Sequence, residues 1–118
     1  MHIEELRELC MGLPSTEECF PFDAETLVFK VCGKMFCLVP LEESPLTFNV
    51  KCDPEKAIDL REHYSGVQSG WHMSKTNWNT VVFDGSFTDV DARQWIIDSY
   101  RLVVAGLPKK VRSTLPQV

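Results

Sequence analysis

The chain has 118 residues, a length that fits one domain able to bury its own core without disulfides or metal. Its hydrophobic fraction of 44% and charged fraction of 25% are typical of soluble globular proteins. The net charge of −5 argues against general binding of polyanions, because phosphate neutralisation needs clustered Lys and Arg. The acids concentrate in residues 1–25, however, and the remainder is close to neutral, so a locally basic face stays possible.

A surface helix is predicted at the N-terminus, where apolar residues recur at helical spacing between Glu and Arg: Ile3, Leu6, Leu9, Cys10 and Leu13. Gly12 and Pro14 should end this helix. The next stretch, LPSTEECFPF, contains two prolines and is predicted to be a loop.

A β-hairpin is predicted over TLVFKVCGKMFCLVP, because two runs rich in β-branched and aromatic residues flank Cys32-Gly33-Lys34. Gly33 can supply the positive φ of the turn. Leu27, Phe29 and Val31 should share one face of the first strand. LTFNVK is predicted to be a third strand.

Two further helices carry clear start signals. In CDPEKAIDLREHY, Asp53 suits the N-cap and Pro54 the first helical position, and Gly66 should follow the end of the helix. In TDVDARQWIIDSYRLVVAGL, Thr88 suits the N-cap with Asp91 three residues later. A strand, NTVVFDG, is predicted between the two helices, and residues 108–118 are expected to form a loosely ordered tail.

These elements predict one α+β domain over residues 1–118, with two layers and the order α-β-β-β-α-β-β-α. Short turns favour antiparallel pairing of about five strands, with the three helices on one face of the sheet. No apolar run approaches the roughly 20 residues that span a bilayer. The N-terminal MHIEELRELC lacks the basic residues and apolar stretch of a signal peptide. We therefore expect a cytoplasmic protein with no membrane partner.

The residues that could carry chemistry do not form a recognisable catalytic or metal-binding pattern. Five cysteines form no CxxC pair, and their odd number favours reduced thiols over a disulfide framework. No GxSxG elbow, P-loop or GxGxxG occurs, and the spacing of Cys52, His63 and His72 selects no nucleophile and base. We expect no enzymatic activity, and hence no catalytic residue, and no metal or cofactor.

Three segments carry a family resemblance: FPFDAETLVFKVCGKMFCLV, FNVKCDPEKAIDLREHYSGVQSGWHMSKTNWNTVVFDG and DSYRLVVAGLPKK. In this order they resemble the MmcQ/YjbR family over roughly residues 11–112. The resemblance implies a frataxin-like or secretion-chaperone-like α+β fold, with no assigned catalytic activity or cofactor. Members are commonly described as candidate DNA-binding proteins, in which two β-hairpin wings would grip a duplex.

One departure from the family is visible. Members usually carry a Lys-x-His-Trp pattern in the turn, whereas this chain has Thr76-Asn77-Trp78. No role that depends on that imidazole therefore transfers to this chain.

The segment SGWHMSKTNWNTV, residues 69–81, is the leading candidate site. In the DNA-binding hypothesis, lysines contact phosphates, while polar and aromatic side chains of the turn lie near a base. The residues assigned to that surface are Lys30, Lys34, Lys51, His72, Lys75, Asn77 and Trp78. The competing structural interpretation has Trp78 closing one end of the core and the lysines on an ordinary wet sheet face.

A second functional hypothesis is a protein-interaction or small-ligand module. Trp71 and Trp78 would then line an apolar groove, and the acidic net charge would be no handicap. An open positive strip across the sheet would favour nucleic acid, whereas a closed pocket beside the tryptophans would favour a ligand.

Overall fold

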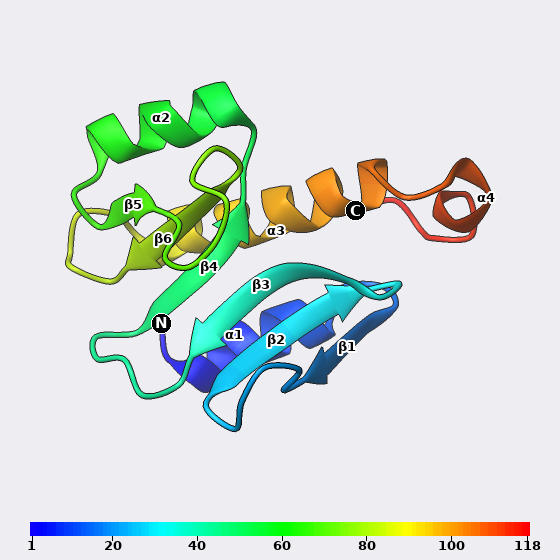
Figure 1. Cartoon of the computed structure of the whole chain (residues 1–118), viewed down its shortest axis with the longest axis horizontal. Coiled ribbons are helices and arrows are strands. Elements are labelled where there is room, and N and C mark those ends of the chain that lie inside the picture. Colours follow the sequence, from blue (N-terminus) through cyan, green and yellow to red (C-terminus); the bar gives the residue numbers. More distant parts are fainter.

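A six-stranded antiparallel sheet organises the computed structural model, which describes all 118 residues (Figure 1). The strand order is β1-β2-β3-β4-β6-β5. The elements, in chain order, are α1 (Ile3–Met11), β1 (Thr16–Cys19), β2 (Thr26–Val31), β3 (Lys34–Pro40), β4 (Thr47–Lys51), α2 (Pro54–His63), β5 (Val67–Ser69), β6 (Trp78–Val82), α3 (Asp89–Ala105) and α4 (Lys109–Arg112). The predicted α+β class and antiparallel pairing are confirmed.

The β2–β3 hairpin turns through two residues with positive φ, Cys32 at 49° and Gly33 at 81°. Two left-handed residues match the twist of the flanking strands, which explains why a tight turn forms here. Farther along, the register shifts by one residue, so Phe36 lies opposite no residue of β2. The neighbours Phe36 and Cys37 accordingly both belong to the main core cluster.

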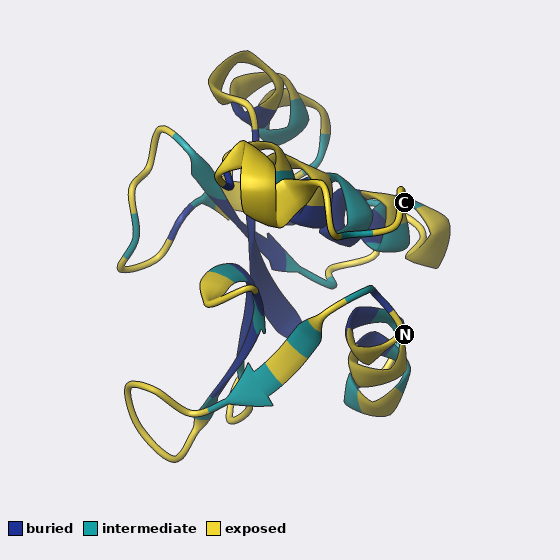
Figure 2. Ribbon diagram, turned by 90° about the vertical axis from the view of Figure 1, so that its right-hand side faces the viewer, coloured by how far each residue is buried: buried dark blue, intermediate teal, exposed yellow.

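Helices α1 and α3 lie on the same face of the sheet (Figure 2). The predicted alternation in β2 is confirmed, because Leu27, Phe29 and Val31 all join the main core cluster. Helix α3 packs across this face, where Phe36 and Tyr100 meet edge to face with ring centroids 5.3 Å apart. The helix begins with the predicted capping box, in which the Thr88 side chain and the Asp91 carboxylate bond to each other's backbone N–H.

Helix α2 lies at the β5 end of the sheet (Figure 1). Its predicted N-cap is confirmed, since the Asp53 carboxylate accepts a hydrogen bond from the Lys56 N–H. Ala57 is its only buried residue, so α2 contributes little apolar area to the core. A buried polar group supplements this packing, because Asn79 Nδ2 donates to the Ala57 carbonyl at 3.4 Å.

Two expectations from the sequence need correction. Residues 16–19 were predicted to lie in a loop, yet they form β1 and pair with β2, which brings the sheet to six strands rather than about five. Residues 109–112 of the expected loose tail form α4, and the chain end returns to α3, where Arg101 Nε donates to the Val118 carbonyl at 2.8 Å. None of the helices combines the length and apolarity needed to cross a bilayer.

Candidate functional site

The face of the sheet opposite α1 and α3 is bordered by exposed loops that project away from the strands (Figure 2). Between these loops lies a hollow of about 540 Å³, here called the trough. Its floor comes from β3 and β4, and its walls from the connections around residues 22, 43 and 72. The trough is lined by Phe22, Asp23, Thr26, Met35, Leu38, Pro40, Glu43, Asn49, Trp71, His72 and Met73.

Trp71 is held in the trough wall by both of its nitrogen atoms. Its backbone N–H donates to Thr80 Oγ1 at 2.8 Å, and its indole Nε1 donates to Gln68 Oε1 at 3.1 Å. The preceding Gly70 allows close chain approach, since an added Cβ would lie 2.9 Å from Trp78 Cβ. The orientation of Trp71 is therefore set by the sheet edge and does not require a bound molecule.

Arg61 of α2 anchors the segment that connects β5 to β6. Its Nε donates to Asn79 Oδ1 at 2.7 Å, and its Nη2 donates to the carbonyl of Lys75 and, at 3.3 Å, to that of Trp78. These bonds hold the end of the connection that enters β6, while the Gly70 N–H, which donates to the Trp78 carbonyl at 2.9 Å, and the Trp71 N–H hold the end that leaves β5. Charged donors make the stronger hydrogen bonds.

Asn49 places an amide donor on the trough floor. The Thr80 hydroxyl accepts from the Trp71 N–H and donates to Asn49 Oδ1 at 2.5 Å, which directs the amide oxygen toward β6. Asn49 Nδ2 donates no hydrogen bond within the protein and reaches the solvent of the trough, since Thr16 Oγ1 is the one fully buried side-chain polar atom that lacks a partner. Because no protein group accepts from Nδ2, this donor is available to a molecule in the trough.

The charged groups lining the trough are acidic. Asp23 and Glu43 contribute carboxylates, whereas no Lys or Arg lines the trough. The N–H groups of Glu25 and Thr26 donate to the Asp23 carboxylate and lower its pKa, so this group is ionised at neutral pH. The trough therefore favours a positively charged or hydrogen-bonding polar group over an anion.

The residues assigned to a nucleic-acid surface are dispersed. His72 lines the trough, whereas the other six assigned residues do not. Lys34 lies at the β2–β3 turn and Lys75 in the β5–β6 connection, both exposed, and Lys30 lies between core residues of β2 and faces away from the helices. Lys51, by contrast, contributes to a different cavity beside α2 and α3.

Asn77 and Trp78 have structural contacts. The Asn77 carbonyl accepts from the Cys52 N–H at 2.7 Å, and Trp78 begins β6 opposite Lys51. Of the two tryptophans proposed for a groove, Trp71 lines the trough and Trp78 does not.

Several trough residues were not identified from the sequence. Phe22 ends the predicted loop and Asp23 follows it, and Met35, Leu38 and Asn49 belong to predicted strands. Strand alternation could have placed Leu38 and Asn49 on the uncovered face, because they are register partners. No local signal indicates that Phe22 and Trp71 lie on opposite sides of one hollow.

Comparison with known proteins gives a consistent family relationship. A family model described as YjbR matches residues 11–102. The protein YbdF of Escherichia coli O157:H7 is 36% identical over 107 residues, which cover 91% of this chain and 88% of YbdF. The protein YjbR of Escherichia coli K12 is 33% identical over 118 residues and both full lengths. Both relatives are described as uncharacterised proteins.

Solved structures show the same fold. The Deinococcus radiodurans protein DR2400, which contains the domain DUF419, superposes with a TM-score of 0.89 at 38% identity, covering 97% of this chain and 88% of DR2400. A Pseudomonas syringae protein superposes with a TM-score of 0.73 at 22% identity, covering 86% of this chain and 98% of that protein, and supports the fold alone.

Proposed function

The chain belongs to the YjbR family, and from this premise and the geometry of the trough we propose that it is a non-enzymatic binding module for small organic molecules. The ligand class is an apolar, ring-containing amine. The observation that carries the proposal is a hollow combining aromatic walls, the Asn49 amide donor left free by the protein, and acidic groups without a Lys or Arg.

The size and lining of the trough suit such a ligand. A volume of about 540 Å³ falls within the range of small-molecule sites, roughly 300–1,000 Å³. Phe22 and Trp71 offer ring faces, and Met35 and Met73 offer adaptable apolar contacts. A protonated amine is attracted both to aromatic faces and to carboxylates. Asp23 and Glu43 therefore supply the charge complement, and Asn49 Nδ2 supplies a donor for an acceptor atom on the ligand.

Titration with 2-phenylethylamine and phenylacetate, followed by amide and indole resonances in ¹⁵N NMR, tests this proposal. These compounds share a ring and differ in the sign of their charge. We expect the amine to shift the Trp71 indole and Asn49 side-chain signals, with the acid binding at least about tenfold more weakly. Trp71→Ala should abolish the shifts at Asn49, and Trp71→Phe should retain them. Equal binding of the two compounds, or no shift with either, would contradict the proposal.

Nucleic-acid binding is the second candidate function, and it depends on different residues. Lys34 and Lys75 are exposed, and Lys30 lies on the uncovered face of the sheet, which supports phosphate contact outside the trough. Such binding should weaken steeply as salt rises, through counterion release. Anisotropy of labelled duplex and single-stranded DNA at low and physiological salt tests it, with a Lys34→Glu, Lys75→Glu double variant. Absence of binding at low salt would rule out this function.

A further inference from the structure

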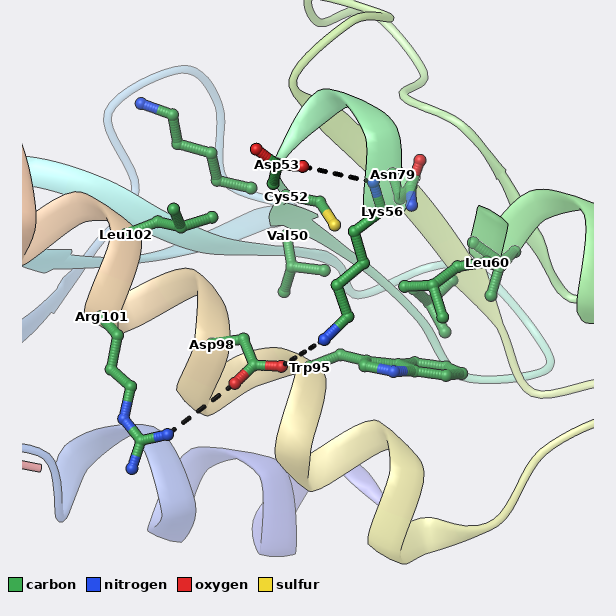
Figure 3. Close-up of a pocket in the computed structure, with 13 residues that line it drawn as sticks. Val50, Cys52, Asp53, Lys56, Leu60, Asn79, Trp95, Asp98, Arg101 and Leu102 are labelled. Carbon is green, nitrogen blue, oxygen red and sulfur yellow. Dashed lines mark hydrogen bonds and ion pairs between the residues drawn. The ribbon is translucent and has the colours of Figure 1, made fainter. Parts of the chain in front are cut away.

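A second cavity, of about 230 Å³, lies between α2 and α3 on the helix-covered side of the sheet (Figure 3). It is here called the interhelical cavity, and it shares no lining residue with the trough. Its apolar walls include Val50, Leu60 and Trp95. Cys52, Lys56, Asp98 and Arg101 add the sulfur and charges seen around it.

Cys52 lies in the wall of this cavity, and its thiol makes no hydrogen bond. The residue is 9% exposed, and its sulfur points toward the space bounded by Lys56 and Val50 (Figure 3). Burial raises the pKa of the Cys52 thiol, so it is a neutral thiol at pH 7. Asn79, the other buried polar residue here, has its oxygen bonded to Arg61 and its nitrogen to the Ala57 carbonyl. The interior is thus suited to an alkyl chain.

At the opening of the cavity, the Asp98 carboxylate is shared between two cations, Lys56 and Arg101. Asp98 Oδ2 lies 3.4 Å from Lys56 Nζ, and its Oδ1 lies 3.9 Å from Arg101 Nη1. Both distances exceed the 2.7–2.9 Å of a good charge-assisted hydrogen bond, and Oδ1 already accepts from Gln94 Nε2 at 2.8 Å. The other nearby acid, Asp53, caps α2. Arg101 Nε donates to the Val118 carbonyl at 2.8 Å, which leaves the two Nη groups of Arg101 and the Lys56 Nζ with capacity for a second carboxylate.

We infer that the interhelical cavity binds a short-chain aliphatic monocarboxylate. The alkyl chain lies against Leu60 and Trp95 and passes the Cys52 thiol, while the carboxylate pairs with Lys56 and Arg101. Charge complementarity selects this class over others that fit the volume. An amine would be repelled by the two cations, and an alcohol would bring no second negative charge to them. The inference rests on a different site from the proposed amine-binding trough and stands or falls independently of it.

Protection of Cys52 from alkylation measures occupancy directly. The protein is treated with iodoacetamide at pH 8 with hexanoate, hexylamine or hexanol at equal concentrations, and each cysteine is quantified by peptide mass spectrometry. Exposed Cys32 is the internal control, because it lies at the β2–β3 turn, remote from the cavity. We expect saturating hexanoate to slow alkylation of Cys52 by at least about tenfold and to leave Cys32 unchanged, with weaker protection by the other two compounds.

Substitutions at the cavity opening show whether protection of Cys52 depends on the two cations there or on a general stabilisation of the fold. The double substitution Lys56→Met, Arg101→Met should weaken hexanoate binding by at least about tenfold, so that hexanoate and hexanol protect Cys52 equally. Asp98→Asn should strengthen hexanoate binding, because it removes the competing carboxylate. Arg93→Met, on the far side of α3 beside Glu5, should change nothing. Protection that is equal for hexanoate and hexylamine, or absent with all three compounds, would overturn the inference.

Discussion

The guanidinium of Arg61 is the side chain that joins α2 to the wall of the trough. It bonds the buried Asn79 amide, the backbone carbonyl of Lys75 in the β5–β6 connection and that of Trp78 at the start of β6. The sequence alone indicates only a basic residue in the last turn of a helix, where it would favour the helix dipole. Its contacts show a second role, because they hold the β6 end of the connection that carries Trp71.

Replacement of Arg61 tests this role. Arg61→Met removes three charge-assisted hydrogen bonds and leaves the buried Asn79 oxygen without its donor. We expect the free energy of unfolding to fall by about 2 kcal/mol, as measured by urea denaturation. Arg93→Met is the matched control, since Arg93 pairs with Glu5 at 3.3 Å near the surface, and its loss should cost less than about 1 kcal/mol. Equal losses in the two variants would contradict an anchoring role.

At the scale of elements, the connection between α2 and β5 is tied to that between β6 and α3. Asp84 accepts a hydrogen bond from Ser65 Oγ at 2.6 Å, and from the hydroxyl and backbone N–H of Ser86 at 2.6 and 3.0 Å. Ser86 Oγ in turn accepts from the Gly66 N–H at 3.1 Å. One carboxylate thus joins two turns that are distant in the sequence.

This network predicts an acid-sensitive contribution to stability. The Ser65 hydroxyl, and then Ser86, lower the pKa of Asp84 from its ordinary 3.8 to about 2. A lowered folded-state pKa stabilises the protein above pH 3.8, and the contribution is lost as pH falls through 2. The difference in Tm between the wild type and Asp84→Asn should therefore shrink between pH 4 and pH 2. In a protein that carries Ser86→Ala, the Tm difference caused by Asp84→Asn should be smaller. A Tm difference that stays constant between pH 4 and pH 2 would refute the lowered pKa of Asp84.

At the scale of the whole molecule, the two faces of the sheet differ in how far they are covered. One face is covered by helices and holds the main core cluster, in which Phe29 is fully buried. The other face is partly shielded by loops and carries large exposed apolar side chains, including Phe22 at 63% exposure. Such residues are expected where a surface is used for binding.

Substitutions of Phe29 and Phe22 distinguish the face of the sheet that stabilises the fold from the face proposed to bind a ligand. Phe29→Ala creates a cavity in the core and should lower the free energy of unfolding by about 3–5 kcal/mol in urea denaturation. Phe22→Ala should change it by less than about 0.5 kcal/mol, because the ring is already in solvent. The same Phe22→Ala variant should weaken 2-phenylethylamine binding, measured by NMR titration. A large stability loss from Phe22→Ala would assign that ring to folding instead.

Whether an element could be predicted depended on whether its signals were local. The Asp53 and Thr88 caps, the hairpin turn at Gly33 and the apolar stripe of α3 are each written within a few neighbouring residues. Strand β1 was missed because TEEC lacks the alternation of apolar and polar residues that marks a strand. It forms a strand by pairing with the edge of β2. Helix α4, only four residues long, carries no side-chain cap that could have identified it.

The sequence by itself determined the fold class, the family and most element boundaries, because backbone geometry and hydrophobic periodicity act over short stretches of chain. The tertiary structure decided the sites. Asn49 and Trp71 border one hollow because β4 and the β5–β6 connection meet through Thr80. Cys52 and Arg101 border another because the start of α2 faces α3, where Lys56 and Asp98 form an ion pair. A binding site is a set of distances between residues far apart in the chain, and those distances exist only after the sheet has been assembled.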